Sequence, residues 1–447
     1  MKIHKIQIKK IYVTDIMLYL YIFSIILTKS TMYGVLQNFQ QRGTDSFSFR
    51  AISLIIGAIS VITLVFKRAF KLNKNKIIKI VVLFIYLSIY GVFNITRIKA
   101  YLEGFFIPFF IACLICCCYR SVKIFEKFFS IYCQIICFLA LISLVFYIFG
   151  TILHIISGIP MMYTNNGWWN SGTNYYYLSF INDWQRITIG GITLIRNVGI
   201  FMEAPGYASA LLYAFWWELF GSDKTHKVNI VILLVTILTT FSAKAYVSAA
   251  LTIIMYLYSG QITLNKCWKR IRCALLPILG GVLVFGAFRI VLMRNISSSG
   301  GDSSLAIRMS DYLATFRAWK DHPLFGCGFY NLNKLYSYYP SIRKSGTSTA
   351  GILNILAYGG VYMAIFYLTP FIKYLKHDIY RKNKYRILSF IILILFSFIT
   401  GDEQYSYFMI FFMALGYMLD TGKHMFTTGE KRIGGNSNAS VYNNSIS

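Results

Sequence analysis

Acidic residues are scarce in this chain, and so is charge of any kind. The 447 residues include 16 Asp+Glu against 44 Lys+Arg, and charged residues make up 13% of the sequence while hydrophobic residues make up 57%. So little charge excludes an ordinary soluble globular domain. The basic residues fall in short clusters between apolar runs, which is the pattern of cytoplasmic loops in a polytopic membrane protein. We therefore expect no nucleic-acid partner, in spite of the net charge of +28.

Three further absences narrow the possibilities. No small-residue cleavage site follows the first apolar run, which starts near Ile11, so we expect a retained span and not a signal peptide. Only Cys327 falls on the outer side of the expected topology, which excludes an outer intramolecular disulfide. No Cys/His spacing and no carboxylate cluster resembles a metal site, so we expect no metal or other cofactor, and cysteines that serve as packing residues.

Long apolar runs dominate what is present. A hydrocarbon core takes about 20 helical residues to cross, and nothing in the chain alternates like a membrane barrel. The sequence therefore predicts an all-α, polytopic integral membrane bundle of about 12 transmembrane helices. The expected spans are 12–28, 49–66, 80–96, 104–118, 128–150, 202–220, 228–241, 245–260, 273–292, 349–371, 387–400 and 405–420.

The distribution of basic residues predicts the orientation. The strongest clusters, Lys67–Lys79 and Lys373–Arg386, fall on the cytoplasmic side if the N-terminus is cytoplasmic, as the positive-inside rule requires. Both termini are then cytoplasmic. We expect one transmembrane domain over residues 1–428 and a disordered cytoplasmic tail over 429–447.

Two long outer loops, 151–201 and 293–348, far exceed the usual length of helix connections. The first holds Trp168, Trp169 and Tyr175 among asparagines and glycines. Aromatic planes beside amides suit the C–H faces and hydroxyls of sugars, so these three are candidate substrate-binding residues. An interfacial aromatic belt explains the same composition.

The second loop contains a helical pattern over 304–320. Apolar residues recur at helical spacing there, while Arg308, Asp311 and Thr315 share a polar face. This pattern predicts an amphipathic helix along the membrane surface. The segment His322–Gly328 then breaks the helix with a proline and two glycines.

The segment that connects the first outer loop to the next span carries Arg196 and Glu203 close together on a backbone broken by Gly199 and Pro205. Ionisable groups at the mouth of a membrane span are functional candidates because they are costly there. The structural alternative is an arginine that snorkels to the interface and a glutamate at a helix N-terminus.

Four segments in a fixed order carry a family resemblance: Arg196–Pro205, Ser242–Lys244, Arg308 with His322–Gly328, and Gly351–Gly360. With these motifs the chain resembles the superfamily of bacterial O-antigen and capsular polysaccharide polymerases (Wzy) and O-antigen ligases. The resemblance implies a helical bundle in the bacterial inner (cytoplasmic) membrane with an outward-facing cavity. It also implies substrates made of glycan on undecaprenyl pyrophosphate, and it allows a flippase and a chain-length regulator as partners.

Two departures from the family pattern bear on the activity. Ala204 separates Glu203 from Pro205, where the family often has Glu directly before Pro. The resemblance to ligases implies a histidine at the position that Ser348 occupies in this chain. The missing imidazole favours a polymerase over a ligase, and Ser348 remains a candidate substrate-binding residue.

The chemistry that the resemblance implies is attack of a sugar hydroxyl on an anomeric carbon with diphosphate as the leaving group. Arg196, Arg308 and Lys244 are the expected phosphate ligands, because fixed cations stabilise a departing diphosphate. Glu203 is the first candidate for a general base and His322 the second. The alternatives that remain are an O-antigen ligase, a lipid-linked oligosaccharide flippase or other transporter, and a glycosyltransferase of another fold.

Overall fold

The computed structural model describes most of the helical part of the chain and part of the first outer loop. The described residues are 13–28, 31–32, 49–66, 74–118, 121–162, 172–176, 179–182, 185–189, 192–221, 226–259, 304–339, 348, 350–379, 384–401 and 403–419. The expected span 273–292, Trp168, Trp169 and the tail 429–447 lie outside these ranges.

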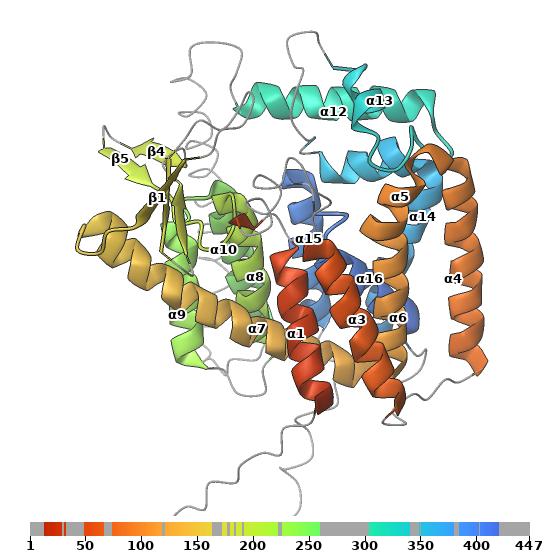
Figure 1. The fold of residues 1–447 in the computed structure, drawn as a ribbon, viewed down its shortest axis with the longest axis horizontal. Coiled ribbons are helices and arrows are strands. Elements are labelled where there is room, and N and C mark those ends of the chain that lie inside the picture. Colours follow the sequence, from red (N-terminus) through yellow and green to blue (C-terminus); the bar gives the residue numbers. More distant parts are fainter. Residues whose placement is uncertain are drawn as a thin grey trace, which may run out of the picture.

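Helices form a bundle in which each expected span within the described residues overlaps an apolar helix (Figure 1). They are α1 (Val13–Leu27), α3 (Phe49–Phe66), α4 (Lys74–Phe93), α5 (Ile98–Tyr101), α6 (Ile107–Cys118), α7 (Ser121–Phe146), α8 (Ala204–Phe220), α9 (Lys227–Thr239), α10 (Ala243–Tyr258), α14 (Gly351–Ile379), α15 (Lys384–Thr400) and α16 (Tyr407–Met418). A short 3₁₀ turn, η1 (Ile95–Arg97), precedes α5, and single π-helical turns, η2 (Leu102–Phe106) and η3 (Tyr147–Ile152), extend α5 into α6 and end α7.

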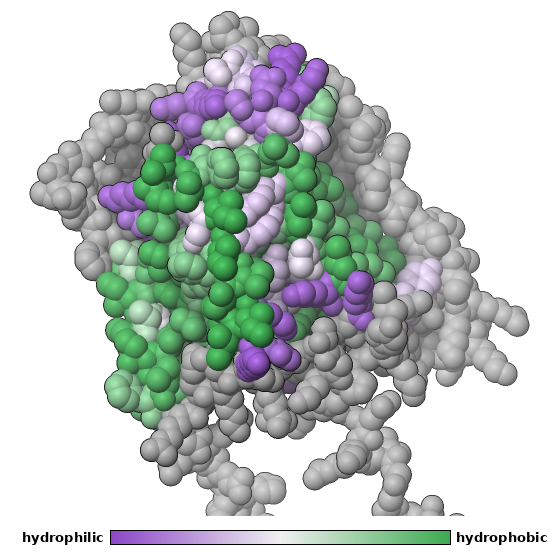
Figure 2. Space-filling model, turned by 90° about the vertical axis from the view of Figure 1, so that its right-hand side faces the viewer, coloured by the Kyte–Doolittle hydropathy of each residue, from purple (hydrophilic) through white to green (hydrophobic). Residues whose placement is uncertain are grey.

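Among the residues that the structure describes, four stretches are long and apolar enough to cross a membrane: Lys74–Phe93, Ile98–Cys118, Ile124–Ile152 and Gly351–Lys376. On α4, Val82 and Phe84 are more than half exposed, and Figure 2 shows a broad hydrophobic band on this side of the molecule, with hydrophilic residues above and below it. An apolar surface of this extent suits lipid and not water. The chain is a helical membrane protein, and twelve spans remain a prediction.

The all-α prediction was wrong for the first outer loop, whose described part contains five short strands. In one sheet β2 (Gly172–Tyr175) pairs antiparallel with both β1 (Ile159–Met162) and β3 (Phe180–Asn182). The strands β4 (Arg186–Ile189) and β5 (Ile192–Ile195) form a separate hairpin, with Arg186 opposite Ile195. The sequence did carry a hairpin signal, because two β-branched runs flank a Gly-Gly pair there.

The expected amphipathic helix exists as α12 (Ser304–Asp321), and it lies across the end of the bundle where the sheets also lie (Figure 1). Its faces were predicted wrongly. Asp311 and Thr315 are fully buried, whereas Met309 and Phe316 are about half exposed. Burial of the polar stripe is possible because the Tyr339 hydroxyl donates to the Asp311 carboxylate (2.7 Å) and the Thr315 hydroxyl donates to the Asp311 carbonyl oxygen (2.7 Å).

The segment after α12 is fastened to a break in α14. Gly360 has a left-handed φ of 61°, and a Cβ there would lie 2.2 Å from the Leu324 carbonyl oxygen, so only glycine fits. The N–H groups that the break frees are satisfied by the turn, since Val361 N donates to Pro323 O (2.9 Å) and Tyr362 N donates to Leu324 O (3.1 Å). The expected straight span 349–371 is therefore bent in its middle, and α12 with the short helix α13 (Leu332–Tyr336) is held against it.

Candidate functional site

Arg196 follows β5 directly and is buried, with only 5% of its surface exposed. Its Nε donates to the carbonyl oxygen of Thr240 (2.9 Å), and its Nη1 donates to Oε1 of Gln185 (3.3 Å). The next side chain, Asn197, donates through Nδ2 to the Thr239 hydroxyl (3.0 Å). The segment after the hairpin is thus fastened to the C-terminal end of α9, and the guanidinium is held in one place.

Gln185 is a residue of this site that the sequence analysis missed. Its side-chain oxygen accepts from Arg196 and also from the backbone N–H of Ala204 (3.4 Å), at the start of α8. Because one buried oxygen contacts both groups, it sets the position of the arginine relative to the residue before α8. Nothing in the sequence marks a loop glutamine for such a role, since its partners lie on other elements.

Glu203 is the N-cap residue of α8, with an extended backbone (φ −132°, ψ 142°) and no hydrogen bond from its side chain to the first turn. The side chain is accessible to solvent, yet burial among neighbouring protein atoms raises the pKa of the Glu203 carboxyl. The guanidinium groups of Arg196 and Arg308 both oppose this rise. Two arginines from separate segments of the chain therefore lie within electrostatic reach of one carboxylate.

Arg308 comes to this point from the first turns of α12. The positive charge of Arg308 also lowers the pKa of Tyr312, one turn further along, against the rise that burial causes. The Tyr312 hydroxyl donates to the carbonyl oxygen of Ile399, near the end of α15. Within the described residues, no hydrogen bond holds the Arg308 guanidinium. Its side chain is half-buried, so its five N–H donors can contact a ligand.

The turn between α9 and α10 also places Lys244 beside the segment that carries Arg196 and Glu203. Phe241 in this turn has a positive φ of 45°, which is strained for a residue other than glycine. The turn aims the Thr240 carbonyl at Arg196 and starts α10, from which Lys244 Nζ donates to the Ser209 hydroxyl of α8 (3.0 Å). Arg196 and Lys244 are thus positioned by one tight turn.

Other predicted site residues lie elsewhere or outside the described chain. His322 ends α12, about 20 Å along the helix axis from Arg308 at about 1.5 Å per residue, and its backbone forms the turn that carries Gly326. Ser348 is buried, and its Oγ accepts from the backbone N–H of Ala350 (3.3 Å), just before α14 begins. Tyr175 stacks on Phe180 within the small sheet (ring centroids 5.1 Å apart).

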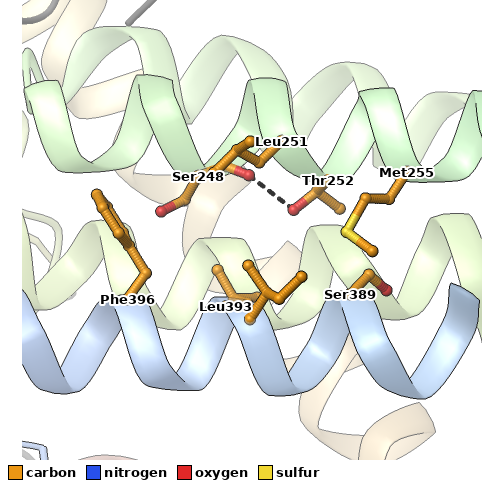
Figure 3. Close-up of a pocket in the computed structure, with 8 residues that line it drawn as sticks. Ser248, Leu251, Thr252, Met255, Ser389, Leu393 and Phe396 are labelled. Atoms are coloured by element: carbon orange, nitrogen blue, oxygen red, sulfur yellow. Dashed lines mark hydrogen bonds between the residues drawn. The ribbon is translucent and has the colours of Figure 1, made fainter. Parts of the chain in front are cut away.

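A small cavity with a mostly apolar lining lies between α10 and α15 (Figure 3). Ser248, Thr252 and Ser389 face it together with apolar side chains, and the Ser248 hydroxyl has no hydrogen-bond partner among the described residues. About 10 Å³ is open there to the centre of a water molecule, which is room for roughly one water. A sugar cannot enter, so we do not count the cavity as part of the substrate site.

The model of the O-antigen ligase family (Wzy_C) matches residues 228–368. The match begins in α9 and ends in α14, so it includes Lys244 and Arg308 and begins after Glu203. It identifies a membrane enzyme of O-antigen or related polysaccharide assembly, acting on lipid-linked glycans. The match places residues 228–368 in the superfamily of Wzy polymerases and O-antigen ligases. No curated protein sequence matches the chain.

Proposed function

We propose that this protein is a polysaccharide polymerase that joins undecaprenyl-pyrophosphate-linked repeat units at the outer face of the inner membrane, with both termini in the cytoplasm. In the reaction, a sugar hydroxyl of one repeat unit forms a bond to the anomeric carbon of the growing glycan. The bond from that carbon to the diphosphate oxygen breaks, and the hydroxyl proton passes to a base. The lipid diphosphate leaves with the bonding electron pair.

One observation carries the proposal. The positive charges of Arg196 and Arg308, which come from different segments, both lower the pKa of the Glu203 carboxyl. Charge develops on the diphosphate as its bond to carbon breaks, and preorganised cations stabilise that charge where it forms. Arg308 is the principal phosphate ligand in this proposal, because its planar guanidinium can bind phosphate through two parallel hydrogen bonds. Lys244 adds a point charge at the α9–α10 turn.

Arg196 has a different part in the proposal, since its Nε and Nη1 already donate to protein oxygens. It contributes positive charge and holds the segment that ends in Glu203. Glu203 is the proposed general base. A raised pKa suits this role, because a base accepts a proton most effectively when its pKa lies near the working pH. His322 follows the end of α12 away from Arg308, and the proposal gives it no part in this proton transfer.

The ligase activity is the second candidate, because the matching family model is described as O-antigen ligase. A ligase would use the same leaving group but transfer finished glycan to a different lipid acceptor. Ser348 speaks against it, since a serine lacks the imidazole expected there. A flippase would form no glycosidic bond, and it gains nothing from cations arranged around a carboxylate at one end of the bundle.

Purified protein in nanodiscs, supplied with undecaprenyl-pyrophosphate-linked single repeat units, tests the proposal. Mass spectrometry of the extracted lipids should show a ladder of two or more repeats and free undecaprenyl pyrophosphate in equal amount to the bonds formed. Transfer of the glycan to an added lipid-core acceptor, with no ladder of repeats on undecaprenyl pyrophosphate, would identify a ligase. Unchanged single units with every acceptor would refute an enzymatic role.

A further inference from the structure

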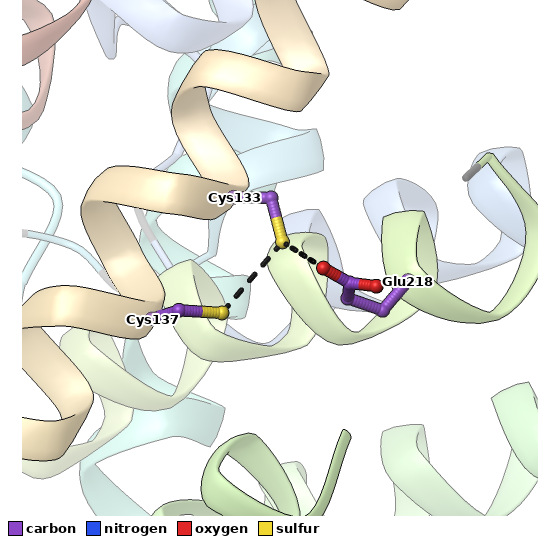
Figure 4. Close-up of side chains that lie close together, drawn as sticks. All are labelled: Cys133, Cys137 and Glu218. Carbon is purple, nitrogen blue, oxygen red and sulfur yellow. Dashed lines mark hydrogen bonds between the residues drawn. The ribbon is translucent and has the colours of Figure 1, made fainter. Parts of the chain in front are cut away.

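A second cluster of reactive side chains lies near the other end of α8, between α7, α8 and α9. Cys133 and Cys137 are one turn apart on α7 and face Glu218 of α8 (Figure 4). The two sulfur atoms are 3.8 Å apart, and Cys133 Sγ lies 3.3 Å from Glu218 Oε1. The three side chains can each offer one ligand atom, all within 4.8 Å of one another.

These groups are buried and incompletely satisfied. Cys133, Cys137 and Glu218 are 2%, 8% and 4% exposed. Asn229 Nδ2 donates to Glu218 Oε1 (2.8 Å), but Oε2 has no hydrogen-bond partner among the described residues. His226 Nδ1 lies 3.5 Å from Oε2 on a side chain that is 60% exposed and can turn. A buried carboxylate without a full set of partners is costly, so the cluster calls for a cation.

The distances fit tetrahedral zinc. Zn–S bonds of about 2.3 Å and Zn–O bonds of about 2.0–2.2 Å at tetrahedral angles place two sulfur ligands about 3.8 Å apart and a sulfur and an oxygen about 3.5 Å apart. The observed 3.8 Å and 3.3 Å are close to these values. Thiolate and imidazole ligands together select zinc over magnesium or calcium, which prefer oxygen.

We propose that Cys133, Cys137 and Glu218, with His226 as the fourth ligand, bind a structural zinc ion that joins α7, α8 and the start of α9. Binding releases the two thiol protons, so the cluster carries one negative charge both before and after the ion enters. The low-dielectric interior therefore gains no net charge. Asn229 positions the carboxylate as a second-shell partner does in known zinc sites.

The proposed ion is separate from the transfer site. Glu218 and Glu203 lie at opposite ends of α8, about 20 Å apart at about 1.5 Å per residue. The sequence analysis expected no metal site and treated the cysteines as packing residues. The one-turn spacing of Cys133 and Cys137 is visible in the sequence, but the approach of Glu218 and His226 appears only when the helices pack.

Metal analysis of the purified protein tests this proposal independently of polymerase activity. Protein prepared without chelator should contain about one zinc per chain by inductively coupled plasma mass spectrometry, and the double variant C133S/C137S close to none. The matched control is C113S/C116S, which removes two other buried cysteines and should keep the zinc. His226→Ala should weaken zinc affinity about 10- to 100-fold.

Cobalt substitution gives a readout that does not depend on the folding of a variant. Wild-type protein loaded with Co²⁺ should show thiolate-to-cobalt charge-transfer absorption and the intense visible bands of tetrahedral cobalt. Wild-type protein that binds neither zinc nor cobalt after incubation with the ions overturns the proposal. Equal metal content in wild type and C133S/C137S overturns it as well, because the ion then lies elsewhere.

Discussion

Replacement of Arg308 by glutamine should reduce glycan polymerisation without loss of the fold. The side chain is half-buried at the start of α12, and its known interactions with described residues are electrostatic, with Glu203 and Tyr312. Glutamine keeps most of the length and a hydrogen-bonding amide but removes the charge. The packing of α12 depends on Asp311 and Thr315, which are fully buried, whereas Arg308 on the same face is only half-buried, so the helix should remain in place.

The size of the effect follows from the lost contact to a charged leaving group. A hydrogen bond to a charged group contributes about 1.5–3 kcal/mol, and one preorganised donor to a developing charge contributes about 3–4 kcal/mol. Because solvent reaches Arg308, we take about 2–3 kcal/mol, which is about a 30- to 150-fold lower rate. Arg308→Lys keeps the charge without the two-pronged geometry and should lose only about tenfold.

The assay is the initial rate of lipid-linked dimer formation from single repeat units. Arg317→Gln is the matched control, because it removes the same charge from an exposed position of the same helix and should leave the rate within about twofold of wild type. Equal rates for Arg308→Gln and wild type would refute the role of Arg308 as a phosphate ligand. Equal losses in Arg308→Gln and Arg317→Gln would show that only the net charge of α12 matters.

Three further predictions concern the supporting residues. The rate should fall as the pH drops through the pKa of Glu203, because protonation removes the base, and burial raises this pKa above that of an ordinary glutamate. Arg308→Gln removes a cation that lowers this pKa, so it should move the midpoint of the residual rate to higher pH. Gln185→Ala should lower the free energy of unfolding by about 1–3 kcal/mol, since it removes the buried oxygen that accepts from both Arg196 and the start of α8. A thermal-unfolding midpoint in detergent equal to wild type would contradict this. Gly360→Ala should destabilise the protein more than Gln185→Ala does, because the added methyl group lies 2.2 Å from a backbone oxygen and φ is positive. A thermal-unfolding midpoint equal to that of wild type would contradict this.

Apolar runs were sufficient to predict the helices, because a stretch such as Lys74–Phe93 has few ways to satisfy its backbone in lipid other than as a helix. The strands β4 and β5 were missed because long apolar segments dominated the interpretation, although a Gly-Gly hairpin signal was present. The faces of α12 could not be predicted from periodicity. Asp311 is buried because Tyr339 reaches it from beyond the next turn, and that contact depends on tertiary structure.

The site was predicted in part for a similar reason. An arginine and a glutamate at the mouth of a span are functional candidates by residue type alone, which was sufficient to select Arg196 and Glu203. The order of the motifs added Arg308 and Lys244. Gln185 carries no such signal, because a neutral loop residue gains importance only from what it contacts. His322, in contrast, has a reactive side chain, but the length of α12 places it away from Arg308.

The central claim is that cations from distant segments hold one departing diphosphate. A double-mutant cycle with Arg308→Gln and Lys244→Met, read out as affinity for undecaprenyl pyrophosphate in nanodiscs, tests it most directly. If both side chains contact the same diphosphate, each variant weakens binding and the two effects are non-additive by about 0.5–3 kcal/mol. Undiminished binding in both variants, or losses that add within about 0.5 kcal/mol, would contradict a shared diphosphate site.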